Sequence, residues 1–457
     1  MHTRTRWACL LVAGLLPLAL LWFSTTANST ITGLRNILQY HAVEAFGGAR
    51  VRAGEPPGAI AGTVRDVAGN PISGAVVLVA SSMGHTYTAE SDSAGNYRIG
   101  NVPPGRYVPV SGKRGFGQAF SEQSAGALRR KPTLTVRPGS ESQGIGFALS
   151  PAKPLPIAVD DSLIISLTMA VEVRAPFPGR AQRTNFSFER AGLRVNDCWL
   201  YEPVESEGEG LPAVSRVEPP AVRTAESPVV SGVEPLPTML LVLPGPVMNW
   251  EIVPVPFAAE GYSVLACYPL RGIDIDEDAA DLLTALEYLR QGAIPSRADT
   301  DQIVLVGASF TSLHSWRLLG LTDEVDVTLV LGGMADGFSF RHDVETGTVH
   351  ARPPFDQVLM ALGFPNTSPE LYFKYSILYH LEGLPPACLL HGRDDELVPF
   401  NQGVLLSAEM TRRGMRHESY AYDGLKHYFS TDADNETTQQ MWRDSLDCLR
   451  NFLASRQ

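Results

Sequence analysis

Short, largely apolar runs recur along the second half of the chain. The first two span Thr238–Leu243 and Tyr262–Pro269. Three more follow, at Ile303–Val306, Val325–Leu331 and Ala387–Leu390. Runs of this length, rich in leucine and β-branched residues, predict strands that are buried on both faces of a sheet.

Helical patterns lie between these predicted strands. From Asp276 to Arg290, leucines recur at the spacing of an amphipathic helix. A second helix-like stretch, Ser312–Leu319, comes shortly after the Ile303–Val306 run. Because strands that alternate with helices favour a parallel sheet covered on both faces, we predict an α/β architecture for this half of the chain.

The first third of the chain has a different pattern, in which short strand-like segments are separated by turn residues. Ala59–Val64 and Gly74–Val79 are two such segments, and residues 66–71 between them contain Asp, Gly, Asn and Pro. Similar turns recur further along this region. Short strands separated by such turns indicate a small all-β sandwich, which we place at residues 57–150.

Composition sets the remaining boundaries. Residues 28–56 are expected to form a linker, and residues 151–183 a connector to the α/β half at 184–457. Residues 202–237 are rich in Pro, Glu, Val and Ser without periodicity, which predicts a flexible insertion. Residues 332–384 fit no simple strand-helix unit and carry several aromatic side chains. They form either a cap over a site or part of the packed core.

One turn in the α/β half carries a candidate nucleophile. The five residues 307–311, Gly-Ala-Ser-Phe-Thr, stand between the Ile303–Val306 run and the Ser312–Leu319 stretch. A glycine-serine turn between a strand and a helix is typical of the nucleophile elbow, which exposes a serine Oγ at the top of a sheet. The usual form of this motif ends in Gly, and Thr311 takes that place here. The pattern predicts Ser309 as the nucleophile.

Two later turns follow predicted strands and contain the groups that activate a serine. Residues 391–399 read His-Gly-Arg-Asp-Asp-Glu-Leu-Val-Pro, directly after the Ala387–Leu390 run. His427 comes shortly after a short predicted strand at Ser419–Tyr422. A serine hydroxyl needs a histidine to accept its proton, and that histidine needs a carboxylate that fixes its tautomer. The candidates are therefore His427 and one of the adjacent residues Asp394 and Asp395.

This order of Ser, Asp and His resembles the α/β-hydrolases, and in particular the dienelactone-hydrolase, acetyl-esterase and prolyl-oligopeptidase-like group. The resemblance covers residues 184–457 and implies an α/β-hydrolase fold, with Ser309 as nucleophile and His427 as general base. The acid of this group is the fifth residue of His-Gly-x-x-Asp-x-x-Val-Pro, which assigns Asp395. His391 is then expected to serve the structure of the loop. The resemblance implies no metal and no organic cofactor.

The predicted oxyanion hole is less regular. Such a hole needs preorganised donors that stabilise the charge of the tetrahedral intermediate. One expected donor is the backbone N–H of Phe310. The second is expected from the loop after the Thr238–Leu243 strand, which begins Pro244-Gly245-Pro246-Val247. Because proline has no N–H, Gly245, Val247 or a nearby side chain must donate, or the hole is incomplete.

Three motifs in the sandwich region resemble the carboxypeptidase regulatory-like (transthyretin-like) domains. They are Gly-x-Val-x-Asp at residues 62–66, Asp-x-x-Gly-x-Tyr at 92–97 and Pro-Pro-Gly-x-Tyr at 103–107. The resemblance implies an accessory module without catalytic residues. Asp66 and Asp92 are more readily explained as turn-forming residues than as metal ligands.

Charge and the N-terminal segment constrain partners and location. The chain has 457 residues and a net charge of −12, with no basic stripe, so a nucleic-acid partner is not expected. Arg4 and Arg6 precede the apolar run Trp7–Phe23, and residues 1–27 are expected to be an export signal or a retained membrane anchor. The predicted location is secreted, periplasmic or anchored to the outer face of the cytoplasmic membrane.

The five cysteines do not predict a disulfide framework. Cys9 lies in the export segment. Cys267 and Cys388 lie on predicted core strands, where they are expected to act as small apolar residues. Cys198 and Cys448 would pair only if the fold happened to bring them together.

These observations together predict an exported serine hydrolase. The favoured activity is that of a carboxylesterase, with an acyl-enzyme on Ser309, His427 as base and Asp395 as the orienting acid. Its substrate is expected to be a small-molecule ester or a peptide. Two alternatives remain: a serine peptidase of the prolyl-oligopeptidase-like kind, and a non-catalytic binding protein on a hydrolase fold.

Overall fold

The structure is a computed structural model, and it describes residue 38 and residues 54–121, 132–153, 164–187, 189–190, 193–194, 196–204, 234–270, 274–353 and 355–455. The predicted export segment (1–27), and most of the predicted linker (28–56) and insertion (202–237), lie outside these residues. The chain divides into two compact units. One comprises residues 1–153 and 337–379, and the other comprises residues 154–336 and 380–457.

The second unit is built on one nine-stranded sheet of order β10-β11-β14-β16-β15-β17-β18-β19-β20. The six strands from β16 to β20 in this order pair in parallel, and β10, β11 and β14 extend the sheet with antiparallel pairings. The strand bounds are β10 (Ile164–Val173), β11 (Gly179–Ser187), β14 (Asn196–Pro203), β15 (Leu236–Val242), β16 (Ser263–Pro269), β17 (Ala298–Ala308), β18 (Val325–Leu331), β19 (Ala387–Gly392) and β20 (His417–Tyr422). Between β11 and β14 lies a short hairpin, β12 (Glu189–Arg190) with β13 (Leu193–Arg194).

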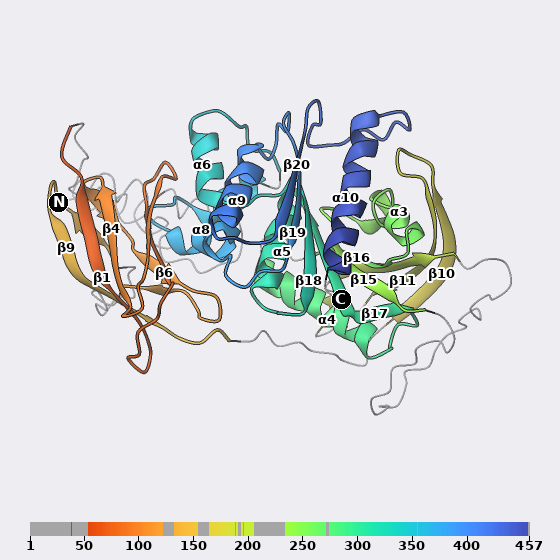
Figure 1. Ribbon diagram of the computed structural model, residues 1–457, viewed down its shortest axis with the longest axis horizontal. Helices are drawn as coiled ribbons and strands as arrows, with labels where there is room; N and C mark the ends of the chain where they lie inside the picture. The colour runs from red at the N-terminus through yellow and green to blue at the C-terminus, as the bar shows by residue number, and fades with distance from the viewer. Residues whose placement is uncertain are drawn as a thin grey trace, which may run out of the picture. The chain divides into compact units, whose positions relative to one another are not determined.

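Helices cover both faces of this sheet, which confirms the predicted α/β class (Figure 1). The helices are α3 (Pro254–Ala259), α4 (Ile275–Arg290), α5 (Ser312–Leu319), α9 (Asn401–Arg412) and α10 (Glu436–Ala454). Alternate strand residues such as Met239, Val304 and Leu390 form one core with Phe257 of α3 and Leu449 of α10. Helices α4 and α5 pack together and contact the strands β15, β16 and β17. Among the described residues, no helix has the length and apolarity needed to cross a membrane.

The hydrolase sheet begins earlier in the chain than the predicted start at residue 184. Strand β10 (Ile164–Val173) and the first part of β11 (Gly179–Ser187) lie within the predicted connector 151–183. The sequence did not reveal β10 because it is the edge strand of the sheet. Leu167 and Met169 are exposed there, so the strand lacks the continuous apolar character of a strand buried on both faces.

The prediction that the cysteines form no disulfide framework is wrong. Cys198 of β14 and Cys267 of β16 face each other across two paired strands and are disulfide-bonded, with a Cα–Cα distance of 4.1 Å. Cys388 of β19 is bonded to Cys448 of α10, with a Cα–Cα distance of 6.1 Å. The two pairs are separated by 69 and 60 residues, so the pairing depends on strand order and helix placement that cysteine spacing does not reveal.

The first unit contains the predicted β-sandwich. Its main sheets have the orders β4-β1-β9 and β3-β2-β6-β7, with a separate β5-β8 pair. The strand bounds are β1 (Gly58–Asp66), β2 (Val76–Ala80), β3 (Thr86–Glu90), β4 (Asn96–Val102), β5 (Gly105–Tyr107), β6 (Val110–Gly112), β7 (Ala119–Phe120), β8 (Leu134–Val136) and β9 (Glu141–Leu149). Ile60, Val77, Ile99 and Phe147 belong to its core. The carboxylate of Asp66 accepts hydrogen bonds from the amides of the turn that follows it, as expected of a turn residue.

A helical insertion between β18 and β19 belongs to the same unit as the sandwich. It contains α6 (Gly337–Glu345), α7 (Phe355–Leu362), α8 (Pro369–Tyr375) and the 3-10 turn η4 (Ile377–Tyr379). His342 Nδ1 lies 3.0 Å from the Met83 carbonyl oxygen, and the Phe373 ring lies directly against Gly112. Core packing, one of the two interpretations of residues 332–384, accounts for the burial of Phe338 and Phe373.

Candidate active site

The nucleophile turn joins β17 to α5 through the 3-10 turn η3 (Ser309–Thr311). Ser309 has a φ of +53°, a left-handed conformation that among the described non-glycine residues only Asn101 shares. A residue held in this conformation is strained, and the surrounding packing must maintain it. A Cβ at Gly307 would lie 2.3 Å from Ser315 Oγ, so only glycine allows β17 to pass this close to α5.

Thr311 departs from the usual motif but fits the turn. Its side chain is buried, and its Oγ1 lies 2.7 Å from the Val242 carbonyl oxygen and 2.8 Å from that of Ala308. The hydroxyl therefore ties the nucleophile turn to the end of β15. A glycine at position 311 would allow close packing, whereas the Thr311 hydroxyl makes hydrogen bonds to the ends of β15 and β17.

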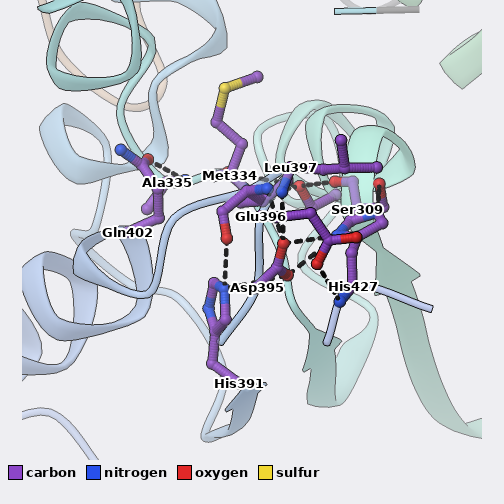
Figure 2. A network of polar contacts seen from close by, with 11 residues as sticks. Ser309, Met334, Ala335, His391, Asp395, Glu396, Leu397, Gln402 and His427 are labelled. Carbon is purple, nitrogen blue, oxygen red and sulfur yellow. Dashed lines mark hydrogen bonds and ion pairs between the residues drawn. The ribbon is translucent and has the colours of Figure 1, made fainter. Parts of the chain in front are cut away.

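The structure brings the three predicted triad residues together (Figure 2). Ser309 Oγ lies 2.7 Å from His427 Nε2, and His427 Nδ1 lies 2.9 and 3.0 Å from the two carboxylate oxygens of Asp395. Because a carboxylate only accepts hydrogen bonds, Nδ1 carries the proton and Nε2 is free to accept from the serine. The neighbouring Asp394 instead accepts a hydrogen bond from the Gly424 amide at 2.7 Å.

Asp395 is held as a buried anion. Its Oδ1 accepts hydrogen bonds from the Leu397 and Val398 amides at 2.9 and 2.8 Å, and its side chain is 3% exposed. Burial by itself raises the pKa of Asp395, but hydrogen bonds from His391, His427 and the Val398 amide outweigh it and lower the pKa to about 2. The carboxylate therefore stays ionised at any pH where the protein would work.

Close backbone packing brings the loop that carries His427 to the acid loop. A Cβ at Gly392 would lie 2.1 Å from the Leu425 carbonyl oxygen, so the glycine of the His-Gly pair makes this approach possible. Glu396 accepts a long hydrogen bond, 3.4 Å, from the His427 amide. The loop motif thus supplies the acid and also the contacts that place the base.

The predicted oxyanion donors lie at the ends of two neighbouring strands. Strand β15 ends at Val242, which is paired with Gly307 of β17, so the loop after β15 starts beside the nucleophile turn. Within the described part of the chain, the amides of Gly245 and Val247 donate no hydrogen bond. Val247 begins the 3-10 turn η2 (Val247–Asn249), where the first amides lack an intrahelical acceptor. The third candidate is the amide of Phe310, which directly follows Ser309.

Sequence reasoning missed the residues that hold the loop after β18. Ser312 Oγ donates to the Ser309 carbonyl oxygen at 2.6 Å and accepts from the Met334 amide at 2.9 Å. Gln402 Oε1 accepts from the amides of Ala335 and Asp336 at 3.1 and 2.9 Å (Figure 2). Ser312 could have been suspected from its position next to the motif. Gln402 gave no signal, because a glutamine in a helix is ordinarily a surface residue.

The fold and this arrangement define a serine hydrolase of the α/β-hydrolase class. Residues 274–449 match the family model of the prolyl oligopeptidase family, and residues 59–150 match that of the carboxypeptidase regulatory-like domain. The sandwich part of the chain is thus similar to one family, and the part that carries the serine, the acid and the histidine is similar to another. No curated protein sequence matches the chain.

Several solved structures are similar to this one. A bacterial heroin esterase is 16% identical with a TM-score of 0.43, over 63% of this chain and 84% of that one. Esterase Est2 of Thermogutta terrifontis is 15% identical with a TM-score of 0.39, over 57% of this chain and 89% of that one. The acylaminoacyl peptidase of Pyrococcus horikoshii is 13% identical with a TM-score of 0.41, over 80% of this chain and 59% of that one.

Proposed function

We propose that this protein is an exported carboxylesterase that acts through an acyl-enzyme on Ser309. The observation that carries the proposal is the continuous line of hydrogen bonds from Ser309 Oγ to His427, at 2.7 Å, and from His427 to Asp395, at 2.9 Å. A serine hydroxyl in this arrangement can lose its proton to the imidazole as it attacks a carbonyl carbon.

In the acylation half, Ser309 Oγ bonds to the carbonyl carbon of the ester and its proton passes to His427 Nε2. The former carbonyl oxygen becomes an anion, and the amides of Phe310 and of Gly245 or Val247 are the proposed donors to it. When the carbon–oxygen bond to the alcohol breaks, His427 Nε2 gives its proton to the leaving alkoxide. Asp395 stabilises the imidazolium while it carries that proton.

In the deacylation half, a water molecule replaces the alcohol. His427 Nε2 accepts a proton from the water as the oxygen bonds to the acyl carbon, and a second tetrahedral anion forms. That intermediate collapses to a carboxylic acid, and His427 returns the proton to Ser309 Oγ. The site is restored with no change in oxidation state.

A serine peptidase is the second candidate, and the match of residues 274–449 to the prolyl oligopeptidase family favours it. The same groups would act on an amide, but His427 must then protonate a much poorer leaving group, the amine. A panel of esters and amides that share one acyl group separates the two activities. An amide kcat/KM comparable to that of the matched ester would favour the peptidase.

The two disulfides support the export part of the proposal. Cys198–Cys267 and Cys388–Cys448 join buried parts of the sheet unit, and such bonds form and persist in oxidising compartments. Alkylation and mass spectrometry of the protein from its native cell would test this. All four cysteines are expected to be oxidised, and reduced thiols at these positions would contradict export.

Labelling with a fluorophosphonate probe tests the core of the proposal, because the probe requires an activated serine rather than a particular substrate. The wild-type protein should be labelled, and Ser309→Ala should not. A folded wild-type protein that resists the probe would favour the third possibility, a binding protein on a hydrolase fold.

A further inference from the structure

A second buried histidine lies beside the triad acid. His391, on β19, is 4% exposed, and its Nε2 is 2.9 Å from the Val398 carbonyl oxygen. Because a carbonyl oxygen only accepts hydrogen bonds, Nε2 carries the proton. The same Nε2 is 3.5 Å from Asp395 Oδ2, so its N–H lies between a carbonyl and a carboxylate (Figure 2).

His391 and Asp395 are both hydrogen-bonded to Val398. The Val398 amide donates to Asp395 Oδ1 at 2.8 Å, while the Val398 carbonyl accepts from His391. His391 thereby holds Val398 in place through its carbonyl, while the amide of the same residue donates to the acid. The longer contact of His391, at 3.5 Å, is with the other carboxylate oxygen, Oδ2. The two contacts together oppose rotation of the Asp395 carboxylate away from His427.

The other face of His391 is closed by helix α9. A Cβ at Gly403 would lie 3.0 Å from His391 Nδ1, so the ring rests against the backbone of this glycine. Both residues line a cavity of about 260 Å³ whose other walls include Leu389 and Phe400. Among the described residues, Nδ1 has no hydrogen-bond partner. Packing therefore fixes the position of the ring, and the single N–H at Nε2 acts on the acid loop.

We propose that His391 is a positioning residue for catalysis, which orients the Asp395 carboxylate toward His427 through Val398 and through Oδ2. This inference rests on the proposed function of the same site. It assigns His391 a role in the reaction, beyond the structural role in the loop that the sequence suggests.

The matched pair His391→Phe and His391→Gln tests the proposal. Phenylalanine fills the space without a donor, whereas the glutamine amide places a donor close to the position of Nε2. We expect kcat for a small ester to fall roughly tenfold in His391→Phe, with KM little changed, and to recover substantially in His391→Gln. Circular dichroism checks that each variant is folded.

The pH dependence distinguishes positioning from a purely structural role. An Asp395 carboxylate that is free to rotate away from His427 stabilises the imidazolium less well. The acid limb of the kcat/KM profile should then move to lower pH in His391→Phe and return in His391→Gln. A loss of activity that is equal at every pH, with no movement of this limb, would overturn the proposal.

Gly403→Ala provides a second test that keeps the imidazole. Alanine favours a helix, so this variant should fold, and its methyl group would press on His391 Nδ1. Misplacing a catalytic group by ~1 Å can lower the reaction rate about 10²-fold. A shift of the His391 ring by a few tenths of an ångström should therefore lower kcat about fourfold. Val404→Ala, at the exposed neighbouring position on α9, is the control and should keep full activity. Equal activities in the two variants would contradict the proposal.

One measurement is independent of turnover. The Nδ1–H proton of His427 can be followed by NMR, with the signal assigned by comparison with His427→Ala. Its hydrogen bond to Asp395 holds this signal downfield, and we expect the signal to move upfield in His391→Phe and to return in His391→Gln. An unchanged signal would refute the positioning role, whether or not the protein proves to be an esterase. Absence of fluorophosphonate labelling would instead refute only the proposed function.

Discussion

The acid loop and the oxyanion loop flank the same serine, but their hydrogen bonds are arranged in opposite ways. In the acid loop, Asp395 accepts from the Leu397 and Val398 amides and from His427. In the oxyanion loop, the amides of Gly245 and Val247 donate to none of the described residues. The acid loop thus uses its donors on the Asp395 carboxylate, whereas two amides of the oxyanion loop have no acceptor among the described residues.

The charges that the two loops face explain this difference. Asp395 is negative through the whole cycle, so permanent donors can hold it in one orientation. The oxyanion exists only near the transition state, and donors that were already paired would have to break a bond to reach it. Catalysis requires interactions that are stronger in the transition state than in the ground state, and unpaired amides meet that requirement.

The largest expected effect comes from the acid loop. Asp395→Asn should lower kcat by about 10⁴, because the histidine loses both its tautomer control and the charge that stabilises its imidazolium. Asp394→Asn is the matched control and should be mild, since the Gly424 amide is the one hydrogen-bond donor to that carboxylate in the described part of the chain. Ester hydrolysis by the two purified variants measures the contrast. A damaging Asp394→Asn with a silent Asp395→Asn would place the acid one residue earlier.

Each loop also lies close to a disulfide in the sheet. Cys388 is on the strand that leads to the acid loop, and the Cys267 carbonyl accepts a hydrogen bond from the Leu243 amide at the start of the oxyanion loop. Closing chain segments of this length should stabilise the folded state by about 4 kcal/mol per bond. Urea unfolding of the Cys388→Ala/Cys448→Ala and Cys198→Ala/Cys267→Ala variants measures this. Midpoints equal to that of the wild-type protein would show that the bonds are not formed.

The oxyanion loop can be tested by deleting one amide. Val247→Pro removes an N–H at the first position of η2, where proline is tolerated, and Pro246 already has a compatible ψ of 132°. If Val247 is the donor, kcat should fall by about 10²–10³ with little change in KM. Val247→Ala keeps the amide and is the control for the loss of the valine side chain. An active Val247→Pro enzyme would leave the amide of Gly245 as the donor.

The smallest expected effect is on stability at acid pH. The lowered pKa of Asp395 means that its ionised form favours folding, by about 2 kcal/mol for a shift from 3.8 to about 2. This contribution is complete above the unfolded-state pKa and is lost as pH falls from about 4 to 2. Urea unfolding of the wild-type protein and Asp395→Asn across this range should show the difference shrinking as pH falls. A constant difference would contradict the assigned pKa.

The sequence alone determined the features that depend on neighbouring residues. Ser309 and Asp395 each lie in a continuous motif whose glycine permits one close backbone contact, at Gly307 and Gly392. The apolar runs likewise predicted the parallel strands, because burial on both faces requires nearly every side chain to be apolar. Local chemistry was therefore enough to predict Ser309, His427, the Asp394–Asp395 pair and the class of fold, and the family resemblance chose Asp395 from the pair.

Only the tertiary structure decided what depends on contacts between distant segments. The disulfides follow from β14 lying beside β16 and α10 lying against β19. The insertion 337–379 joins the unit of the sandwich, so removal of the sandwich would expose aromatic side chains such as Phe373. The contact between His391 and Asp395 likewise depends on the folded shape of the acid loop. Strand order, register and loop shape set these contacts, and they are properties of the packed chain as a whole, which no short stretch of sequence encodes.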